Sequence, residues 1–552
     1  MRLKVFLALI AVFAALFSSG CADKGKAADG AFSAAAKAVS APADTGAAQA
    51  AGKIRPIAKP AKDIPFVTLS CKKGEDITQT LRDTLADKRR ILIPKGTYRI
   101  TGPVSVPSDT VIKGEPGTVL KVGGFPKKDV MYGAIPEGAP LEHVFEVSGA
   151  RSENGGPAEP CDNVTIANLS FVAAEKSSSW AAVMALSVRS LTLENLDTDG
   201  MSIAYLSLAD RLRNGRLSFF SRNKITSDES LNRNVMILNC SANGKGKERV
   251  GAGIFIEYCR DFAVSGCRIE NCRRGIELHG GEQHRVNYEK DSFVTVKSGA
   301  VTGCSVRQIE DDGIFAQRCD FITVKDCRVS DSRMGAGISF WGSGDFRAEG
   351  CRVSDCQTGY CTGQNCSGNI AIVNCRSGFA GRKAGYGARH YYNGNSKVIP
   401  SSARIVIENC EFEGNIAGYI GLSGPAKGIV FKHNRCVNAM IEVLEGNKNG
   451  EGIESNITVE KNTFEDHTEG IDSLTAAIYA DIRTGTSLSV TGNTFKGDHG
   501  LGISIIDASP GGGGKAHIDG NTLEGYNTDI SVGARNGITV TGGDFRGEIQ
   551  KI

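Results

Sequence analysis

A short phrase recurs along most of the chain and constrains its fold more than any other feature. It consists of a small or polar residue, then Asn, Gly or Asp, then Cys or Asn, and an apolar residue two positions later, as in SGCRI, KDCRV and TGNTF. Repeats with a period of 20 to 50 residues are typical of solenoids. The central residue of the phrase is Leu169, Leu196, Cys240, Cys267, Cys304, Cys327, Cys351, Cys375, Cys410, Asn434, Asn462, Asn493, Asn521 and Gly543.

The runs around each phrase alternate apolar and polar residues, as at Ile322 with Val324 and at Ile457 with Val459, and Gly, Asn and Asp bound them. This period of two indicates short β-strands. A unit of roughly 23 residues cannot bury its own apolar side chains, whereas stacked units give every strand a parallel partner on both sides. The sequence therefore predicts an all-β fold, a single-stranded right-handed parallel β-helix over residues 65–552. Strands spaced by about 4.8 Å would make it about 60 Å long.

Composition agrees with this fold and excludes others. The chain has 68 glycines and only 16 prolines in 552 residues, without a collagen period, which indicates frequent tight turns between strands. Lys and Arg number 64 and Asp and Glu 61, so the formal charge is +3. Such a balance gives no basic field for a phosphate backbone, and we expect no nucleic-acid partner.

The first 20 residues have the layout of an export signal. Arg2 and Lys4 precede an apolar run, Val5–Phe17, which is too short to span a bilayer comfortably. Ser18-Ser19-Gly20-Cys21 resembles a bacterial lipobox, which implies lipidation at Cys21; ordinary signal cleavage nearby is the alternative. Residues 21–64 are rich in Ala, Lys, Pro and Gly and predict a flexible tether. We expect an exported envelope protein, an outer-membrane lipoprotein that contacts the membrane through its lipid only.

An N-terminal helix is predicted to cap the first coil. Asp76 and Gln79 have the spacing of a capping box, and Ile77, Leu81 and Leu85 form an apolar stripe at helical spacing. A solenoid needs such a cover over the open end of its core.

Seventeen cysteines in an exported chain suggest a disulfide framework at first. Seven of them, however, hold the central position of the phrase, where stacked side chains interdigitate inside the coil. Free cysteine behaves as a small buried hydrophobe, so we interpret them as reduced and stacked, with a few bridges between neighbouring rungs as the alternative. The asparagines that follow at this position predict an amide ladder.

The segments ILIPKGTYRI (91–100) and VPSDTVIKGE (106–115), with the later NC and GN rungs, resemble the pectin-lyase-like superfamily. That superfamily contains pectate lyases, polygalacturonases, alginate lyases and epimerases, phage tailspike glycosidases and NosD-like copper-accessory proteins. The resemblance implies polysaccharide chemistry on a β-helix. Asp311-Asp312 resembles the paired aspartates of polygalacturonases, and His279-Gly280-Gly281 is similar to their histidine motif, but no complete catalytic signature of one branch is present.

Aligning the repeats on strands that begin with Gly gives two columns that alternation turns outwards. Aromatic faces stack on sugar rings, Gln and Arg bind hydroxyls or carboxylates, and Glu or His can move protons. An oligosaccharide groove needs this set of groups, although polar residues are also the default on any solvated sheet. The fourth position after the glycine is Glu257, His279, Gln317, Trp341, Gly363 and Arg389, and the second is Phe255, Glu277, Phe315, Ser339, Cys361 and Gly387.

Insertions are expected to wall this groove. Residues 282–296 follow His279 and residues 391–402 follow Arg389, whereas the insertion at 206–233 is placed less securely. Loops that leave one corner of a solenoid commonly bound a binding cleft. The loop edges add His390 and Tyr391 as substrate-binding candidates beside Gln317, Trp341 and Phe315.

Two chemistries fit these residues. In β-elimination or C5-epimerisation, Arg389 or a calcium ion would neutralise a uronate carboxylate while His279 takes the C5 proton. In hydrolysis, two carboxylates among Glu257, Glu277, Asp311 and Asp312 would act as acid and base. The alternative for Asp311 and Asp312 is a purely structural role, in which they only form a turn before Gly313.

The leading hypothesis is an envelope-anchored enzyme that acts on an acidic polysaccharide, with calcium as its one candidate cofactor and no metal ligands assigned. The alternative is a non-catalytic glycan-binding or adhesin-like lipoprotein. A NosD-like copper role ranks last, because the chain has only 7 Met and 8 His.

Overall fold

The computed structural model describes most of the chain after residue 63, within one compact unit, Gly46–Ile552. The expected signal segment, Cys21 and the tether up to residue 63 lie outside the described residues. For 209–213 and 216–219 only the backbone is described. The described ranges are 64–125, 142–148, 160–174, 180–207, 209–213, 216–219, 231–244, 250–280, 296–342, 344–363, 366–378, 384–390, 403–422, 426, 428–444, 455–466, 476–482, 485–497, 500–507, 513–533, 538–545 and 548–551.

Each turn of the chain contributes one strand to each of three sheets, which we number in chain order. The first sheet contains β1 (Val67–Thr68), β2 (Arg90–Ile93), β5 (Val111–Gly114), β8 (Cys161–Ala173), β10 (Val188–Asp199), β14 (Asn232–Leu238), β17 (Cys259–Ser265), β20 (Val296–Thr302), β23 (Cys319–Lys325), β26 (Phe346–Glu349), β29 (Asn369–Val373), β32 (Arg404–Glu408), β34 (Gly428–Lys432), β36 (Ser455–Glu460), β39 (Thr486–Thr491), β42 (Lys515–Glu524) and β44 (Ile538–Phe545).

The second sheet shares the long strands β8, β10, β42 and β44 with the first. Its other strands are β3 (Thr97–Ile100), β6 (Val119–Val122), β15 (Ser241–Asn243), β18 (Arg268–Glu270), β21 (Ser305–Ile309), β24 (Arg328–Ser332), β27 (Arg352–Ser354), β30 (Arg376–Gly378), β33 (Glu411–Leu422), β35 (Arg435–Leu444), β37 (Thr463–Asp466) and β40 (Thr494–Gly497).

The third sheet includes the C-terminal halves of β33 and β35. Its other strands are β4 (Val104–Val106), β7 (Glu142–Ser148), β9 (Trp180–Leu186), β11 (Ser202–Ser207), β16 (Val250–Glu257), β19 (Cys272–His279), β22 (Ile314–Gln317), β25 (Ala336–Trp341), β28 (Thr358–Thr362), β31 (Ala384–His390), β38 (Ala476–Ile482), β41 (Leu501–Asp507), β43 (Thr528–Gly533) and β45 (Glu548–Lys551).

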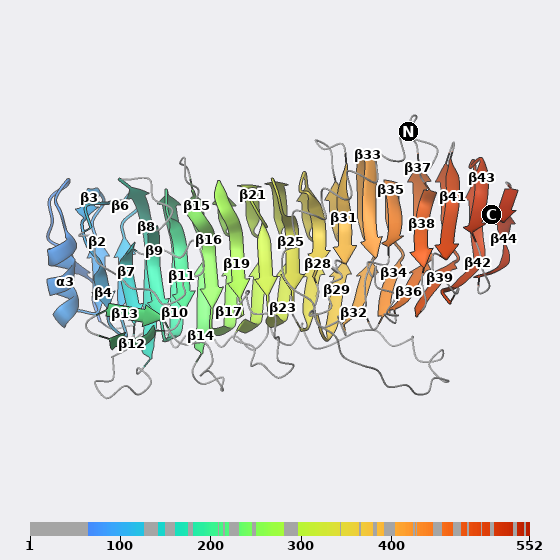
Figure 1. Ribbon diagram of the computed structural model, residues 1–552. Coiled ribbons are helices and arrows are strands. Elements are labelled where there is room, and N and C mark those ends of the chain that lie inside the picture. Colours follow the sequence, from blue (N-terminus) through green and yellow to red (C-terminus); the bar gives the residue numbers. More distant parts are fainter. Residues whose placement is uncertain are drawn as a thin grey trace. The chain divides into compact units, whose positions relative to one another are not determined.

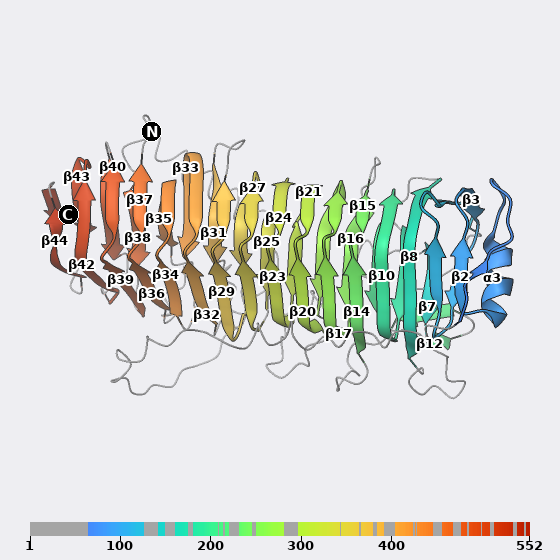
Figure 2. The same ribbon diagram turned by 180° about the vertical axis from the view of Figure 1, so that it is seen from behind.

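The pairing of these strands confirms the predicted fold class. The three sheets form one continuous array of 43 strands, in which each strand pairs in parallel with the strand one turn later, as β16 pairs with β19 and β19 with β22. The turns stack side by side from the N-terminal helix to β45 (Figures 1 and 2). Among the described strands, only β12 (Ala209–Arg213) and β13 (Arg216–Phe219) pair antiparallel, within the insertion at 206–233. The chain is a right-handed parallel β-helix.

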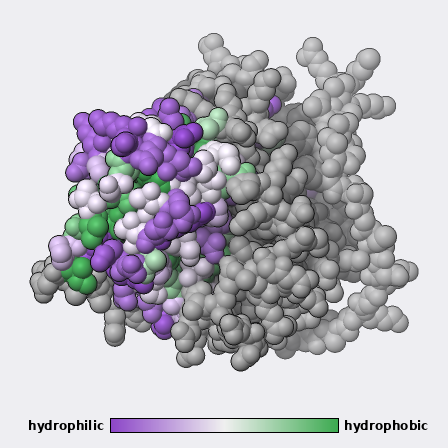
Figure 3. Space-filling model, turned by 90° about the vertical axis from the view of Figure 1, so that its left-hand side faces the viewer, coloured by the Kyte–Doolittle hydropathy of each residue, from purple (hydrophilic) through white to green (hydrophobic). Residues whose placement is uncertain are grey.

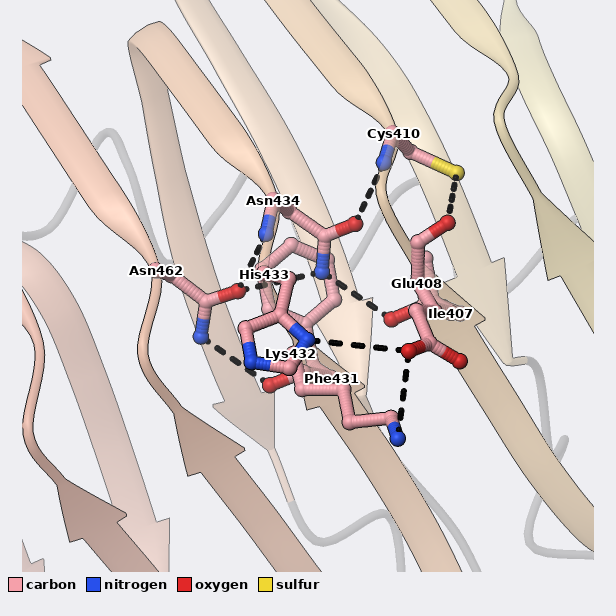
Figure 4. A network of polar contacts seen from close by, with 8 residues as sticks. All are labelled: Ile407, Glu408, Cys410, Phe431, Lys432, His433, Asn434 and Asn462. Carbon is pink, nitrogen blue, oxygen red and sulfur yellow. Dashed lines mark hydrogen bonds and ion pairs between the residues drawn. The ribbon is translucent and has the colours of Figure 1, made fainter. Parts of the chain in front are cut away.

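The central residues of the repeated phrase stack one above another inside the coil, as predicted. The side-chain oxygen of Asn434 accepts the backbone N–H of Cys410 at 2.8 Å, and that of Asn462 accepts the N–H of Asn434 at 2.8 Å (Figure 4). In the turns that precede Asn434, cysteine thiols take the same position, and Cys410 Sγ accepts the N–H of Cys375 at 3.4 Å. All cysteines in the described part of the chain are free, so the predicted reduced stack is confirmed there and the bridges are not found.

The residue before each central position turns the chain at the corner. Asn239, Asp326 and Asn409 have φ of 52°, 52° and 54°, and Gly350 has 64°. Left-handed φ is tolerated best by glycine and then by asparagine and aspartate, whose short side chains bond locally. This corner therefore explains why the repeated phrase reads Asn, Gly or Asp before Cys or Asn.

The N-terminal helix α3 (Thr78–Asp87) caps the first coil, with Ile77, Leu81 and Leu85 buried as predicted. Asp76 accepts hydrogen bonds from the Thr78 N–H at 3.0 Å and the Thr78 hydroxyl at 2.6 Å. The reciprocal half of the capping box is wrong, because Gln79 donates forward to Asp83 instead. At this end of the stack hydrophilic residues predominate on the coloured surface, with smaller hydrophobic areas between them (Figure 3).

Two further expectations concern segments that lie largely outside the described residues. The insertions predicted at 282–296 and 391–402 lie outside the described residues except for Val296, the first residue of β20, so the proposed groove walls stay predictions. Over the part of the chain that is described, no helix has the length and apolarity to cross a membrane.

Candidate functional site

A column of glycines fixes the register of the third sheet. A Cβ on Gly275 would lie 2.3 Å from the carbonyl oxygen of Gly313, and a Cβ on Gly313 would lie 2.3 Å from Cγ1 of Val329. At this corner the second sheet packs directly against the start of the third, so no side chain fits. Since a glycine recurs at this position in successive turns from Gly253 to Gly387, the strand segments after it run in register.

The predicted columns are formed for most of their length. Glu257, His279, Gln317 and Trp341 are direct neighbours on β16, β19, β22 and β25. The second column continues from Phe255 in the same way, through Glu277, Phe315, Ser339 and Cys361. Ile254, Ile256, Ile276 and Leu278 alternate with these residues and are fully buried in the core, so both columns lie on the outer side of the sheet.

Arg389 does not extend the first column. It pairs with Cys361 and therefore continues the second column, beside Gly421 of the next turn. The expected alignment used Gly385-Tyr386 as the start of the strand, whereas Gly387 is the glycine that faces Gly359. A shift of two residues preserves the inward and outward alternation, so it moves Arg389 from one outward column to the other.

His390 points into the coil, which corrects its interpretation as a substrate-binding residue at a loop edge. It is in register with Thr362 and Leu422 and is 3% exposed. The Thr362 hydroxyl lies 2.6 Å from His390 Nδ1, so the imidazole is a hydrogen-bonded core residue. Tyr391 lies outside the described residues.

The outward columns are much less accessible than a solvated groove would be. Glu257, His279 and Gln317 are 2%, 3% and 6% exposed, and Phe255, Glu277 and Phe315 are also buried. Trp341 is partly exposed, and its indole lies over Gly363 of the next turn, where an added Cβ would meet Cδ2 at 2.3 Å. The column is thus an enclosed polar layer that opens towards Trp341.

Glu257 and His279 form a buried acid–imidazole pair. Glu257 Oε1 lies 3.4 Å from His279 Nδ1, and the Ser207 hydroxyl donates to Glu257 Oε2 at 2.9 Å. Phe255 stacks on Tyr205 with 4.6 Å between ring centroids and lies 5.9 Å from the His279 ring. Buried charges persist when they are paired and hydrogen-bonded, and this layer supplies both conditions.

Gln317 has the one side-chain atom of this column that lacks a partner among the described residues. Its Oε1 is buried without a hydrogen bond, between His279 and Trp341 in the register. An unpaired buried acceptor destabilises the folded protein by about 1–3 kcal/mol. A ligand hydroxyl or N–H at this place would satisfy it.

A cluster around Arg274 joins residues that the sequence left separate. The Arg274 guanidinium donates to Glu277 at 2.6 Å and lies 3.0 Å from Asp311 Oδ2. It also lies over the Phe315 ring, 4.4 Å from the centroid. Sequence reasoning missed Arg274, although its place directly before a column glycine, like that of Asp312 before Gly313, was a usable signal.

Asp312 is a carboxyl of this cluster whose pKa is raised. Burial and the charge of Asp311 raise its pKa to about 7, while the Ala336 N–H, which Asp312 Oδ1 accepts at 2.7 Å, and the charge of Arg274 oppose this. A carboxyl that keeps its proton near neutral pH can act as a general acid. Asp311 accepts a hydrogen bond from Arg274 Nε at 3.1 Å.

A second polar group lies further along the same face. The Arg389 guanidinium stacks on Tyr386 at 4.4 Å, and the Tyr386 hydroxyl donates to Glu442 at 3.0 Å. Burial raises the pKa of Glu442, against a hydrogen bond from Tyr386 and the charge of Arg389. Tyr479 follows Glu442 in the column and is half-buried. Tyr386, Glu442 and Tyr479 were not predicted.

No three His, Cys, Asp or Glu side chains in the described ranges are arranged to hold a metal ion. The carboxylates near one another are held by Arg274 instead. A calcium ion therefore stays a prediction without assigned ligands.

The comparisons with known proteins agree on the class of fold. A family model described as right handed beta helix region matches residues 293–399, a minority of the chain. The chain has a right-handed parallel β-helix fold, in agreement with this family model. No curated protein matches its sequence.

Similar solved structures include proteins of different roles. PfbA, a surface adhesin of Streptococcus pneumoniae, is 13% identical over 86% of this chain and 93% of its own, with a TM-score of 0.35. The Gp54 tailspike of Acinetobacter baumannii bacteriophage AP22, in complex with capsular saccharide, is 10% identical over 81% and 75%, with a TM-score of 0.40. The Azotobacter vinelandii mannuronan C-5 epimerase AlgE6 A-module is 11% identical over 86% and 96%, with a TM-score of 0.30. TM-scores this low support no conclusion about chemistry, so the chemistry of this chain is argued from its own residues.

Proposed function

We propose that this protein is a carbohydrate-active β-helix protein that hydrolyses an acidic polysaccharide lying along the outer side of the third sheet. The observation that carries the proposal is Gln317, whose buried, unpaired oxygen lies between His279 and Trp341 in a column of outward polar residues. Sugar hydroxyls are donors that would complete this hydrogen bond, and the partly exposed indole of Trp341 offers a face for a sugar ring.

Hydrolysis fits the carboxylates better than elimination does. In the proposed reaction Asp312 donates its proton to the glycosidic oxygen as the bond from this oxygen to the anomeric carbon breaks. Glu277, positioned by Arg274, acts on the opposite side of the sugar, either as a base that takes a proton from the attacking water or as a nucleophile whose glycosyl ester water then hydrolyses. Phe315 lies next to Glu277 in the column and is buried, and its ring supports the Arg274 guanidinium that positions Glu277.

The alternative of β-elimination by His279 with Arg389 as carboxylate clamp loses support. His279 is on β19 and Arg389 on β31, four turns away, which corresponds to about 19 Å at the strand spacing of about 4.8 Å. One monosaccharide cannot reach both groups. Arg389 would instead contact a sugar several units along the polymer.

Turnover is tested on a panel of acidic polysaccharides, with reducing ends and the absorbance of new C=C bonds as readouts. We expect reducing ends without C=C absorbance, and about 100-fold or greater loss in Asp312→Asn. Asp331→Asn is the matched control, because Asp331 is an exposed carboxylate near the C-terminal end of β24, on the second sheet. The rate should fall as pH rises above about 7, where Asp312 loses its proton.

C=C absorbance in wild type would contradict hydrolysis and favour elimination. Full activity of Asp312→Asn would remove Asp312 from the reaction. Both outcomes are interpreted only for variants that melt within a few degrees of wild type.

Binding without turnover is the second candidate function, and the low exposure of Glu257 and His279 favours it. A buried pair that only fixes the shape of a binding surface needs no access to solvent. Saturable polysaccharide binding with no new reducing ends or C=C bonds would establish this function and overturn the enzymatic one.

We also propose that Cys21 carries a lipid that anchors the protein in the cell envelope, and that the export signal ends at residue 20. Mass spectrometry of the mature N-terminus tests this. A diacylated Cys21 supports the proposal, whereas an unmodified mature chain that begins elsewhere refutes it, independently of any activity on polysaccharides.

A further inference from the structure

A row of arginines lies on the second sheet, apart from the candidate site on the third. Arg328, Arg352 and Arg376 are direct neighbours on β24, β27 and β30, and we call these three residues the arginine row. All three side chains are exposed. In-register parallel strands place them about 4.8 Å apart along the stack.

Glutamates neutralise the C-terminal end of this row. Arg376 Nη2 lies 2.7 Å from Glu413, and its Nη1 lies 3.5 Å from Glu411. Two turns beyond Arg376, Arg435 is paired with Glu411 at 2.9 Å and with Glu465 at 2.7 Å. Arg376 and Arg435 of the second sheet are therefore both neutralised by glutamates on neighbouring strands.

Arg328 and Arg352 differ from their neighbours, because neither makes an ion pair with any residue in the described ranges. Arginine cannot lose its charge, and like charges directly opposite each other on a sheet are destabilising. On the other side of each arginine the outward positions are small, since Ser330, Ser354 and Gly378 are in register. The guanidinium groups of Arg328 and Arg352 therefore lie beside a strip of the second sheet that carries only small residues.

We propose that the arginine row binds a linear polysaccharide that carries uronate carboxylates. A guanidinium matches a carboxylate with two parallel hydrogen bonds. Cations repeated along the stack suit a partner whose anions are also repeated along a line, and a rung spacing is similar to the length of one sugar in an extended chain. The near-zero formal net charge gives no general field for nucleic acid.

This inference deepens the proposed function, because it assigns a uronate polymer to a surface separate from the reacting groups. The row would hold the polymer on the second sheet while another stretch of it occupies the third. Binding through the row does not require that the third sheet catalyses anything, so the two proposals fail separately.

The test measures binding of polygalacturonate and alginate by the full mature protein, with dextran sulfate, anionic phosphatidylglycerol vesicles and duplex DNA as competing classes. We expect salt-dependent binding of a carboxylated polymer, weakened about tenfold in Arg328→Gln/Arg352→Gln. The control Lys73→Gln/Lys121→Gln removes the same charge from exposed lysines near the N-terminal end and should bind like wild type.

A variant of opposite sign sharpens the test. Glu413→Gln removes the closest partner of Arg376, frees its guanidinium and should strengthen binding of the same polymer. These side chains are exposed, so all variants should melt like wild type.

Equal binding by the double variant and wild type would overturn the proposal, as would preference for vesicles, DNA or dextran sulfate over both carboxylated polymers. Turnover of short oligosaccharides separates the two proposals. If it is unchanged in Arg328→Gln/Arg352→Gln while polymer binding is lost, the row is a binding surface. If turnover is absent in wild type but the row still binds polymer, the hydrolytic function fails alone.

Discussion

Asn462 provides the most quantitative test of the amide ladder inside the coil. Its side-chain oxygen accepts the Asn434 N–H at 2.8 Å and the Asn434 side-chain amide at 3.1 Å. Its own amide donates to the Phe431 carbonyl at 3.0 Å and to Asn493 Oδ1 at 2.9 Å. The residue is 1% exposed, so water cannot replace these partners.

The substitution Asn462→Ala leaves these groups unequally affected. The Asn434 N–H loses its acceptor, which is expected to destabilise by about 1–3 kcal/mol. The Asn434 side chain keeps a bond to Ile407, and Asn493 keeps the Asn462 backbone N–H, so their losses are about 0.5–1.5 kcal/mol each. We expect a total of about 2–6 kcal/mol.

Asn462→Cys should be about half as damaging, because Cys410 already accepts a neighbouring N–H through its sulfur in the same column. His433→Asn is the matched control: His433 is an exposed corner residue with φ of 54°, which asparagine adopts readily. Unfolding of a stacked repeat is not one global step, so hydrogen exchange of the segment 429–437 is the assay. The reasoning is refuted if Asn462→Ala and Asn462→Cys lower local protection equally, or if neither lowers it.

Three further predictions follow from single features. Gly313→Ala should lower the melting temperature markedly, because the added Cβ would collide with Val329 and the Gly337 carbonyl. Gly378→Ala is the control, since no atom lies within 4 Å of its Cβ and its melting temperature should not change. Equal effects of the two substitutions would contradict the corner packing. Because the pKa of Asp312 is raised, the folded protein holds a proton that the unfolded chain releases. The free energy of unfolding should therefore fall as pH rises from about 4 to about 7. The melting temperature of Asp312→Asn should lack this pH dependence. Most of the 17 thiols should resist a thiol reagent until the protein is denatured, since burial keeps the reagent away from them. Burial also raises the pKa of Cys361 to about 12. Rapid modification of many thiols in the native protein would contradict the cysteine stack.

The fold was predictable because its signals are local and repeated. A corner that needs left-handed φ selects Asn, Asp or Gly, and the following buried position selects Cys or Asn, so every turn shows the same phrase. The glycine before the third-sheet strand is fixed by contact with Val329 or its equivalent in other turns. These constraints recur in each turn and are visible without any structure.

The site was predictable only in part, because it depends on contacts between turns. The segment 384–388 contains two glycines, and either alignment keeps the alternation, so the position of Arg389 was set two residues off. His390 points inwards in either alignment, because it directly follows the outward Arg389, so alternation alone was a usable signal for its direction. The cluster of Arg274 with Asp311 joins a strand to a turn 37 residues later, and no pattern in the sequence pairs them.

Trp341 allows the most direct test of the claim that a polysaccharide lies along the third sheet. The chain has two tryptophans, and Trp180 is buried in the core, so Trp180→Phe leaves Trp341 as the sole emitter. Titrating this variant with uronate oligosaccharides should change the emission saturably, with the midpoint that calorimetry gives for binding. An unchanged emission while calorimetry reports binding would place the sugar elsewhere and contradict the assignment of the site.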